Sequence, residues 1–263
     1  MPISAKQHTS HDMVQVEDLT LAWRDIVVLK DISLRITKGQ VVTLIGRSGC
    51  GKTTLFQALA GFEEPAHGSI TINGINAYKR HDLVGYLRQS DLLLPWLSVI
   101  DNVCLPLRAA GMSLQQAQTH AKGMLSDFGL SGTEKMFPHE LSGGMRQRAA
   151  LLRTHLMGRE VLLCDEPFSA LDAFTRKDMQ RWLLNIIDRY NNTALIITHD
   201  IDEALFLSDK IIVLQGDPMH GLPTKIAKIV TVDASRTKRE VFAASREAYI
   251  IKQEIVSLLG SKE

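Results

Sequence analysis

The feature that most constrains this chain is a glycine-rich loop between an apolar run and a helix-forming run. The loop spans residues 46–54, after the strand-like run 41–45 and before the helix formers at 55–60. Its glycines let the backbone turn tightly, so that successive N–H groups and the positive end of the next helix converge on one anion. Lys52 adds a cation, and the Thr53 hydroxyl is placed to ligate Mg²⁺. We therefore expect a phosphate site that is made by Gly46, Ser48, Gly49, Cys50, Gly51, Lys52, Thr53 and Thr54.

The overall composition is that of an ordinary globular protein. With 263 residues, 45% apolar and 22% charged, the chain can bury one large core or a core plus a subdomain. Lys and Arg number 30 against 29 Asp and Glu, so the net charge of +1 gives no reason to expect nucleic acid as a partner. The three widely spaced cysteines favour a reducing compartment, the cytosol, over a disulfide framework or a zinc site.

Neither the start of the chain nor its most apolar stretch predicts membrane insertion. Residues 1–12 have no apolar core that could serve as a secretion signal, and we expect them to be a disordered polar lead. The stretch 92–107 is interrupted by Pro95 and polar residues, and it falls short of the ~18 apolar residues that a spanning helix needs. Any role at a membrane is therefore expected to pass through a partner.

The hydrophobic pattern predicts an α/β fold with a mainly parallel sheet. Strand-like runs occupy 14–21, 27–36, 41–45, 69–72, 83–87, 161–164, 194–198, 210–214 and 226–232. The first two runs are expected to pair antiparallel, as an amino-terminal β-subdomain. Later strands alternate with helical stretches at 173–189 and 201–207, which is typical of parallel strands.

Two further segments are expected to be helical. Ser98-x-x-Asp101 and Ser113-x-x-Gln116 look like capping boxes that open helices, within an inserted helical subdomain of about residues 96–158. One helix from about residue 238, capped by Thr237 and Glu240, is expected to form a carboxy-terminal tail over 236–263. The domain that carries the expected phosphate site then covers residues 13–235.

A pair of carboxylates follows the buried strand 161–164. In α/β sheets this end of a strand is where ligands are presented. Asp165 is placed to hold Mg²⁺ directly or through water, and Glu166 could accept a proton from an attacking water. The alternative is that these residues are a solvated strand end.

Residues 141–148 form a second helix start rich in small residues. Ser142, Gly143 and Gly144 precede a helical run, so they could bind an anion as the first loop does, or they could simply cap the helix. A chain with one nucleotide site has no evident use for a second phosphate cradle, unless the cradle closes on a nucleotide held by another copy.

Together these motifs resemble the nucleotide-binding subunit of ABC transporters over about residues 14–214. Residues 46–53 resemble the Walker A loop, 141–147 the signature sequence, 163–166 the Walker B strand and 169–172 the D-loop. Gln89 resembles the Q-loop glutamine, and His199 resembles the switch histidine. The resemblance implies a P-loop NTPase fold, a RecA-like mainly parallel sheet with the two subdomains named above.

The resemblance also implies a mechanism with ATP and Mg²⁺ as cofactors. Two copies would face each other head to tail as an ATP-dependent homodimer, in which the ATP of one chain is covered by the signature sequence of the other. The covering residues would be Ser142, Gly143, Gly144 and Gln147. Glu166 would activate water, His199 would contact the γ-phosphate, Gln89 would sense Mg²⁺ and the water, and Asp172 would bridge the chains.

Two residues near the loop each have two interpretations. Trp23 occupies the position at which the family carries an aromatic residue that stacks on adenine, but it could instead pack into the amino-terminal sheet beside Leu19 and Leu21. Cys50 lies near a helix start, which predicts a thiol of lowered pKa and raised reactivity, although it could equally be a small filler of the loop.

Residues 89–103 resemble the nitrate, sulfonate and taurine importer branch, which includes importers of pyrimidine precursors of thiamine. This implies a peripheral subunit at the cytoplasmic face of the inner membrane, with a separate permease and an extracytoplasmic solute-binding protein. Leu92, Leu93, Leu94 and Trp96 are expected to form a groove for a permease helix, or else to be core. The rival functions are a non-transport ABC ATPase and a monomeric P-loop kinase or GTPase.

Overall fold

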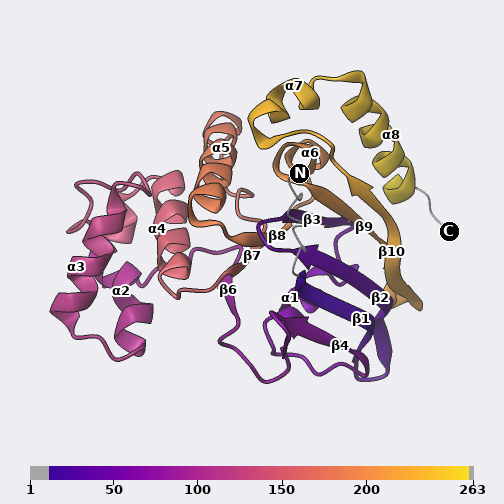
Figure 1. Ribbon diagram of the computed structural model, residues 1–263, viewed down its shortest axis with the longest axis horizontal. Coiled ribbons are helices and arrows are strands. Elements are labelled where there is room, and N and C mark those ends of the chain that lie inside the picture. Colours follow the sequence, from indigo (N-terminus) through magenta and orange to yellow (C-terminus); the bar gives the residue numbers. More distant parts are fainter. Residues whose placement is uncertain (1–11, 261–263) are drawn as a thin grey trace, which may run out of the picture.

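The computed structural model describes residues 12–260, in which a single mixed sheet is covered by helices (Figure 1). The strands are β1 Asp12–Trp23, β2 Ile26–Thr37, β3 Val41–Gly46, β4 His67–Ile72, β5 Ile75–Asn76, β6 Val84–Leu87, β7 Val161–Asp165, β8 Thr193–Ile197, β9 Lys210–Asp217 and β10 Leu222–Thr231. The α-helices are α1 Lys52–Leu59, α2 Val99–Ala109, α3 Leu114–Leu125, α4 Gly143–His155, α5 Ala173–Tyr190, α6 Ile201–Leu207, α7 Arg239–Ala243 and α8 Arg246–Gly260. Short 3₁₀ turns lie at η1 Pro138–Glu140, η2 Pro218–His220 and η3 Arg236–Lys238.

The strand order is β5-β4-β1-β2-β10-β9-β3-β8-β7-β6. Strands β9, β3, β8, β7 and β6 run parallel to their neighbours in this series, whereas β5, β4, β1 and β2 pair antiparallel. Strand β10 joins the two parts, because it pairs antiparallel with β9 and parallel with β2. The predicted fold class is confirmed, with the antiparallel amino-terminal strands continuing the parallel sheet.

The central strands are continuous apolar runs, because other elements pack on both of their faces. Every residue of β3, β7 and β8 is buried. Successive side chains point to opposite faces, so Leu162 and Cys164 pack toward the helical subdomain and α5. Val161 and Leu163 pack with α1 and the amino-terminal strands. The carboxyl ends of these strands are therefore held rigidly, and the loops that follow them are well positioned.

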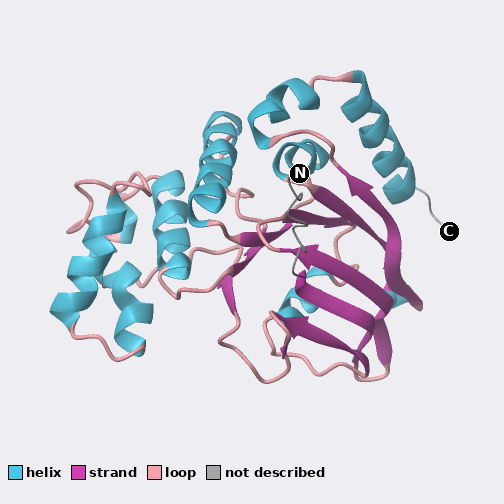
Figure 2. Ribbon diagram, viewed as in Figure 1, coloured by secondary structure: helices cyan, strands magenta, loops and turns pink. Residues whose placement is uncertain are grey.

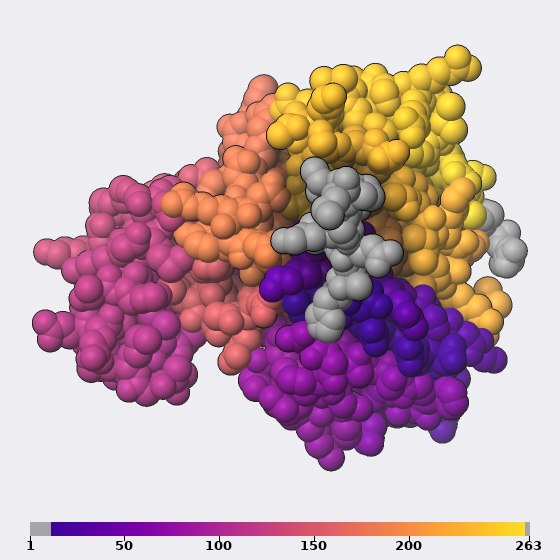
Figure 3. All heavy atoms as spheres, in the orientation of Figure 1, coloured from indigo at the N-terminus to yellow at the C-terminus, as the bar shows by residue number. Residues whose placement is uncertain are grey.

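The inserted helices α2, α3 and α4 gather at one end of the sheet (Figure 2). In the space-filling view they form a lobe that projects from the rest of the molecule (Figure 3). Ser113 and Gln116 make the predicted capping box at the start of α3. At α2 the prediction is half right: Ser98 accepts the Asp101 N–H, but its hydroxyl donates to the Asp101 carboxylate, which does not reach back to the backbone.

The prediction of one unbroken tail helix is wrong. The chain forms η3, then the short α7, and then α8, which starts after Ser245. The Ser245 hydroxyl accepts the Ala248 N–H at 3.1 Å and so caps a new helix. Thr237 and Glu240 do not cap the tail; Glu240 instead forms an ion pair with Arg181 of α5. Strands β9 and β10 also extend further toward their hairpin than predicted, to Asp217 and from Leu222.

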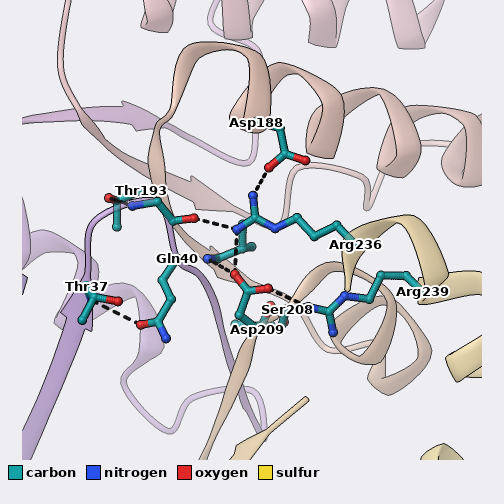
Figure 4. Close-up of polar contacts among 11 residues, drawn as sticks. Thr37, Gln40, Asp188, Thr193, Ser208, Asp209, Arg236 and Arg239 are labelled. Carbon is teal, nitrogen blue, oxygen red and sulfur yellow. Dashed lines mark hydrogen bonds and ion pairs between the residues drawn. The ribbon is translucent and has the colours of Figure 1, made fainter. Parts of the chain in front are cut away.

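A cluster of ions anchors the tail to the edge of the parallel strands (Figure 4). The Asp209 carboxylate accepts hydrogen bonds from the Val41 N–H at 2.9 Å and from Arg236 and Arg239 at 2.6 Å each. Arg236 also donates to the Gly39 carbonyl and pairs with Asp188.

The predicted lead of residues 1–12 is wrong at its last residue, because Asp12 opens β1. Residues 1–11 lie outside the described part of the chain.

Candidate functional site

The glycine loop joins β3 to α1 and wraps around Lys52. Gly49 and Gly51 have φ values of +82° and +94°, which glycine adopts without strain. A Cβ on Gly46 would lie 2.7 Å from the Cys50 Sγ, so glycine is also required there for space. The Lys52 ammonium donates to the Gly46 carbonyl at 2.8 Å and to the Arg47 carbonyl at 2.9 Å. The predicted loop, strand and helix are all present.

An open cavity of about 650 Å³ lies over this loop. Its lining includes Ser48, Gly49, Gly51, Lys52, Thr53, Thr54, Trp23, Ile26, Pro218, Met219 and Glu166. Trp23 is 63% exposed, so the alternative that it packs into the amino-terminal sheet is wrong. One wall of the cavity is thus polar and basic, and the other carries an exposed indole.

Two carboxylates, Asp165 and Glu166, lie at the end of β7, and Glu166 lines the cavity. Asp165 accepts a hydrogen bond from the Tyr86 hydroxyl at 3.3 Å. Burial, and to a smaller extent the neighbouring charge of Glu166, raises the pKa of Asp165, although the Tyr86 hydrogen bond opposes this shift. A carboxylate that is desolvated next to another one is suited to holding a cation. Sequence reasoning did not identify Tyr86, because a tyrosine inside a strand carries no distinguishing signal.

Glu166, Gln89 and His199 come together although they follow three different strands. The Gln89 amide donates to Glu166 Oε2 at 3.1 Å, and His199 Nδ1 lies 3.6 Å from the same oxygen. Glu166 has a φ of +47°, and its N–H donates to the Ile197 carbonyl at 3.0 Å, which ties it to β8. Gln89, which was predicted to sense Mg²⁺ and the water, and His199, which was predicted to contact the γ-phosphate, therefore meet at one oxygen of Glu166, the residue predicted to activate the water.

The second helix start lies apart from the loop within the chain. Ser142 caps α4 by accepting the Met145 N–H at 3.3 Å. Gly144 packs against Thr175 of α5, where a Cβ would approach the methyl group to 3.2 Å. Neither these residues nor Gly143 and Gln147 are among the described residues that line the cavity over the loop.

Asp172 is the N-cap of α5. Its carboxylate accepts the N–H groups of Phe174 and Thr175 at 3.1 Å each. Hydrogen bonding to Thr175 is the main cause that lowers the pKa of Asp172. The side chain therefore stays ionised at the surface, next to the second helix start.

The prediction of a reactive Cys50 is contradicted. The thiol is 1% exposed, and burial raises its pKa although the nearby Lys52 charge opposes the shift. The side chain fills the inside of the loop against Gly46. Cys50 is thus the small filler of the second interpretation.

The apolar segment after Gln89 is only partly a surface. Leu92 and Trp96 are 53% and 70% exposed, but Leu93 is core and packs with α2, so its assignment to a docking groove is wrong. Asn102 holds the segment through the Leu94 N–H at 2.7 Å and the Leu94 carbonyl at 3.0 Å. Arg153 of α4 donates to the carbonyls of Asp91 and Leu92 at 2.6 Å each. Sequence reasoning missed both Asn102 and Arg153; the signal for Asn102 is a polar residue on the apolar face of α2.

Comparison with known proteins shows which family the chain matches. Residues 29–169 match the family model described as ABC transporter. The formylaminopyrimidine import ATP-binding protein ThiZ of Halalkalibacterium halodurans is 35% identical over 93% of this chain and 98% of its own. The taurine import ATP-binding protein TauB of Yersinia pestis is 44% identical over 78% and 81%. The aliphatic sulfonates import ATP-binding protein SsuB 1 of Paracoccus denitrificans is 46% identical over 77% and 79%.

Solved structures agree with the sequence matches. A dimeric, post-hydrolysis structure of the ATP-binding cassette MJ0796 with ADP and Pi superposes with a TM-score of 0.72, at 26% identity over 85% of this chain and all of that one. CbiO1 from Clostridium perfringens, part of the complex cbiONQ, shares the fold with a TM-score of 0.78 at 24% identity over 92% and 94%.

The chain therefore belongs to the ABC transporter family, and it is an ATPase. Within that family it matches the ATP-binding subunits of importers, as the resemblance implied. Over residues 12–260 we find no helix with both the length and the apolar character needed to cross a bilayer.

Proposed function

We propose that this chain works as an ATP-dependent homodimer that powers an importer at the cytoplasmic face of the inner membrane. The observation that carries the proposal is the separation of two anion-binding helix starts. Lys52 lies in the cavity over the loop, whereas Ser142 lies outside it. Head-to-tail pairing of two copies would bring each Ser142 helix start over the partner's loop. The dimeric MJ0796 cassette supports this arrangement.

Each group near the cavity has a chemical role in the proposal. Trp23 offers its exposed indole face to adenine, and the loop amides and Lys52 bind the phosphates. Glu166 takes a proton from the attacking water, with Gln89 and His199 beside its carboxylate.

Thr53, Gln89 and Asp165 fit a bound Mg²⁺, because a hydroxyl, an amide oxygen and a carboxylate are the ligand types this ion prefers. When bound, Mg²⁺ would neutralise charge on the phosphates. Burial raises the pKa of Asp165, and a bound cation would oppose this shift because it favours the ionised carboxylate.

The relatives suggest a small solute of the nitrate, sulfonate and taurine type or a pyrimidine-type vitamin precursor. They are named for formylaminopyrimidine, taurine and aliphatic sulfonates. The solute would pass through a separate permease, supplied by an extracytoplasmic binding protein. Exposed Leu92 and Trp96, with half-buried Leu94, are the proposed permease contact.

The test is the association state of a hydrolysis-deficient variant. Glu166→Gln should sediment as a dimer with MgATP and as a monomer without nucleotide, whereas Lys52→Ala should remain monomeric in both conditions. A Glu166→Gln protein that binds ATP and stays monomeric would favour the monomeric kinase or GTPase alternative. Co-purification of the native complex with a permease separates transport from a non-transport ABC ATPase.

A further inference from the structure

The tip of the β9–β10 hairpin lines the cavity over the loop, and the proposed function assigns it no role. Pro218 and Met219 belong to the 3₁₀ turn η2 at this tip, and they line the same cavity as Trp23 and Lys52. Met219 is 74% exposed and Trp23 is 63% exposed. Two large apolar side chains from distant parts of the sequence therefore face solvent in one cavity, which is typical of a ligand site.

The topology of the sheet explains why these segments meet. Strand β9 runs parallel to β3, so its end lies at the end of the sheet from which the glycine loop starts. Strand β10 returns antiparallel to β9 and runs parallel to β2, with Thr224 opposite Leu29, so β10 and β2 both start at this end. Trp23 pairs with Ile26, the first residue of β2. The order β2-β10-β9-β3 thus places the hairpin tip between the β1–β2 turn and the loop (Figure 1).

The turn that carries Met219 is closed by several contacts. Pro218 is buried, and its ring fixes the backbone at the start of the turn. The Gly221 N–H donates to the Pro218 carbonyl at 3.1 Å, and Gly221 ends the turn with a φ of +81°. His220 Nδ1 lies 2.8 Å from the Asp217 carboxylate. Met219 is therefore an exposed side chain on a well-defined turn.

The cavity combines two kinds of surface that a nucleotide requires. Lys52, Thr53 and the loop glycines provide its polar, basic lining, whereas Trp23 and Met219 provide an apolar lining. A ring that stacks on the indole has a second face and edges that remain to be covered. Methionine suits such a contact, because its thioether is flexible and polarizable and interacts favourably with aromatic rings.

We propose that Met219 contacts the adenine ring of bound ATP together with Trp23, so that the tip of the β9–β10 hairpin completes the base-binding part of the site. The inference rests on the proposed binding of ATP at this loop. Met219 takes no part in holding the phosphates or in hydrolysis. Its contribution therefore belongs to the affinity for the base.

The experiment compares the binding of two probes by calorimetry, one with a base and one without. Met219→Ala should raise the Kd for the non-hydrolysable analogue AMP-PNP by about three- to tenfold, the range that sulfur–aromatic contacts contribute. Its Kd for inorganic tripolyphosphate should change by less than about twofold, because Lys52 and the loop are untouched. Met219→Leu keeps an apolar side chain of similar volume and should lose less affinity than Met219→Ala.

Met112→Ala is the matched control. Met112 is also exposed, at 40%, but it follows α2 in the helical subdomain and is absent from the described lining of the cavity. Both probes should bind this variant as they bind the wild type. The proposal is overturned if Met219→Ala binds AMP-PNP with wild-type affinity. It is also overturned if the affinities for AMP-PNP and tripolyphosphate fall equally, because Met219 would then support the loop and not the base.

Trp23→Ala makes the failure of this inference distinguishable from that of the proposed function. If Trp23→Ala binds AMP-PNP as tightly as the wild type, the proposed base site is wrong, and Met219 has no base to contact there. If Trp23→Ala loses affinity for AMP-PNP while Met219→Ala does not, the proposed function stands and this inference alone is overturned.

Discussion

Glu166 Oε2 lies 3.6 Å from His199 Nδ1, at the ends of two neighbouring parallel strands. Gln89 donates to the same oxygen at 3.1 Å. This arrangement leaves one acidic group facing the loop cavity, with two neutral or cationic groups to orient it.

Glu166→Gln should slow ATP hydrolysis by about 10²–10⁴-fold, because the amide cannot accept a proton from water. ATP affinity should be kept, since Lys52 and the loop amides are unchanged. Single-turnover phosphate release and fluorescence-detected nucleotide binding measure the two quantities. Glu247→Gln, at an exposed position of α8, is the matched control. Normal turnover in Glu166→Gln would mean that another group activates the water.

Trp23→Ala should weaken ATP binding by about tenfold, given that stacking on a base contributes about 1–3 kcal/mol. Trp23→Phe should retain most of the affinity because it keeps an aromatic face. The exposed indole lines the cavity over the loop, so its fluorescence should also be quenched by ATP. Equal affinity in wild type and Trp23→Ala would show that adenine binds elsewhere.

The three cysteines should resist alkylation in the folded protein. Cys50, Cys104 and Cys164 are all buried, and burial raises the pKa of each, to about 11 for Cys104 and about 12 for Cys164. The reactive thiolate is therefore scarce at neutral pH. Mass spectrometry after iodoacetamide treatment should count no modification in the native state and three after denaturation. Rapid labelling of Cys50 alone would contradict the packing of the loop.

Asp209→Ala should destabilise the protein by about 3–5 kcal/mol, the usual effect of breaking a buried ion pair. Its carboxylate is the partner of Arg239, whose side chain is 1% exposed, and of Arg236. Asp31→Ala removes the exposed pair with Lys225 and should cost less than about 1 kcal/mol. Urea unfolding measures both. Similar midpoints for the two variants would show that the tail is not anchored through Asp209.

Much of the fold could be predicted because local signals and tertiary structure agree in it. The buried strands β3, β7 and β8 are apolar runs, and Ser142 and Ser113 begin helices as expected. The tail could not be predicted in the same way. Its apolar period continues through Ala244, while the break depends on Ser245 capping a new helix.

Site residues that belong to a sequence motif could be predicted, whereas residues whose role depends on tertiary packing could not. The order of motifs identified Gln89, Glu166 and His199, which meet in space. The sequence did not predict that Cys50 and Leu93 are buried, because each lies next to an exposed residue. The contacts that Arg153 makes with residues 91 and 92, and the contact of Gln180 with Glu203, join elements distant in sequence. A single sequence does not show which residues of such elements meet.

Replacing Glu203 should change how stability depends on pH. Burial, with a smaller contribution from the charge of Asp200, raises the pKa of Glu203 from 4.5 to about 7, although hydrogen bonds from Thr198 and Gln180 oppose it. The folded protein thus binds this proton more tightly than the unfolded chain. The resulting stability is fully present below about pH 4.5 and is lost as pH rises toward about 7.

The charged and titratable groups around Glu203 are Arg176, Lys177 and Arg181 of α5, Glu240 of α7, Glu166 after β7, and His199, Asp200 and Asp202 of its own segment. They are the same in Glu203→Gln, so the difference between the two proteins isolates Glu203. Between about pH 4.5 and pH 7, the free energy of unfolding of Glu203→Gln should rise relative to wild type by on the order of 2 kcal/mol. Above about pH 7 this difference should stay constant. Urea unfolding at a series of pH values measures the difference. Curves that stay parallel from acid to neutral pH would show that the Glu203 carboxyl titrates alike in the folded and unfolded chains.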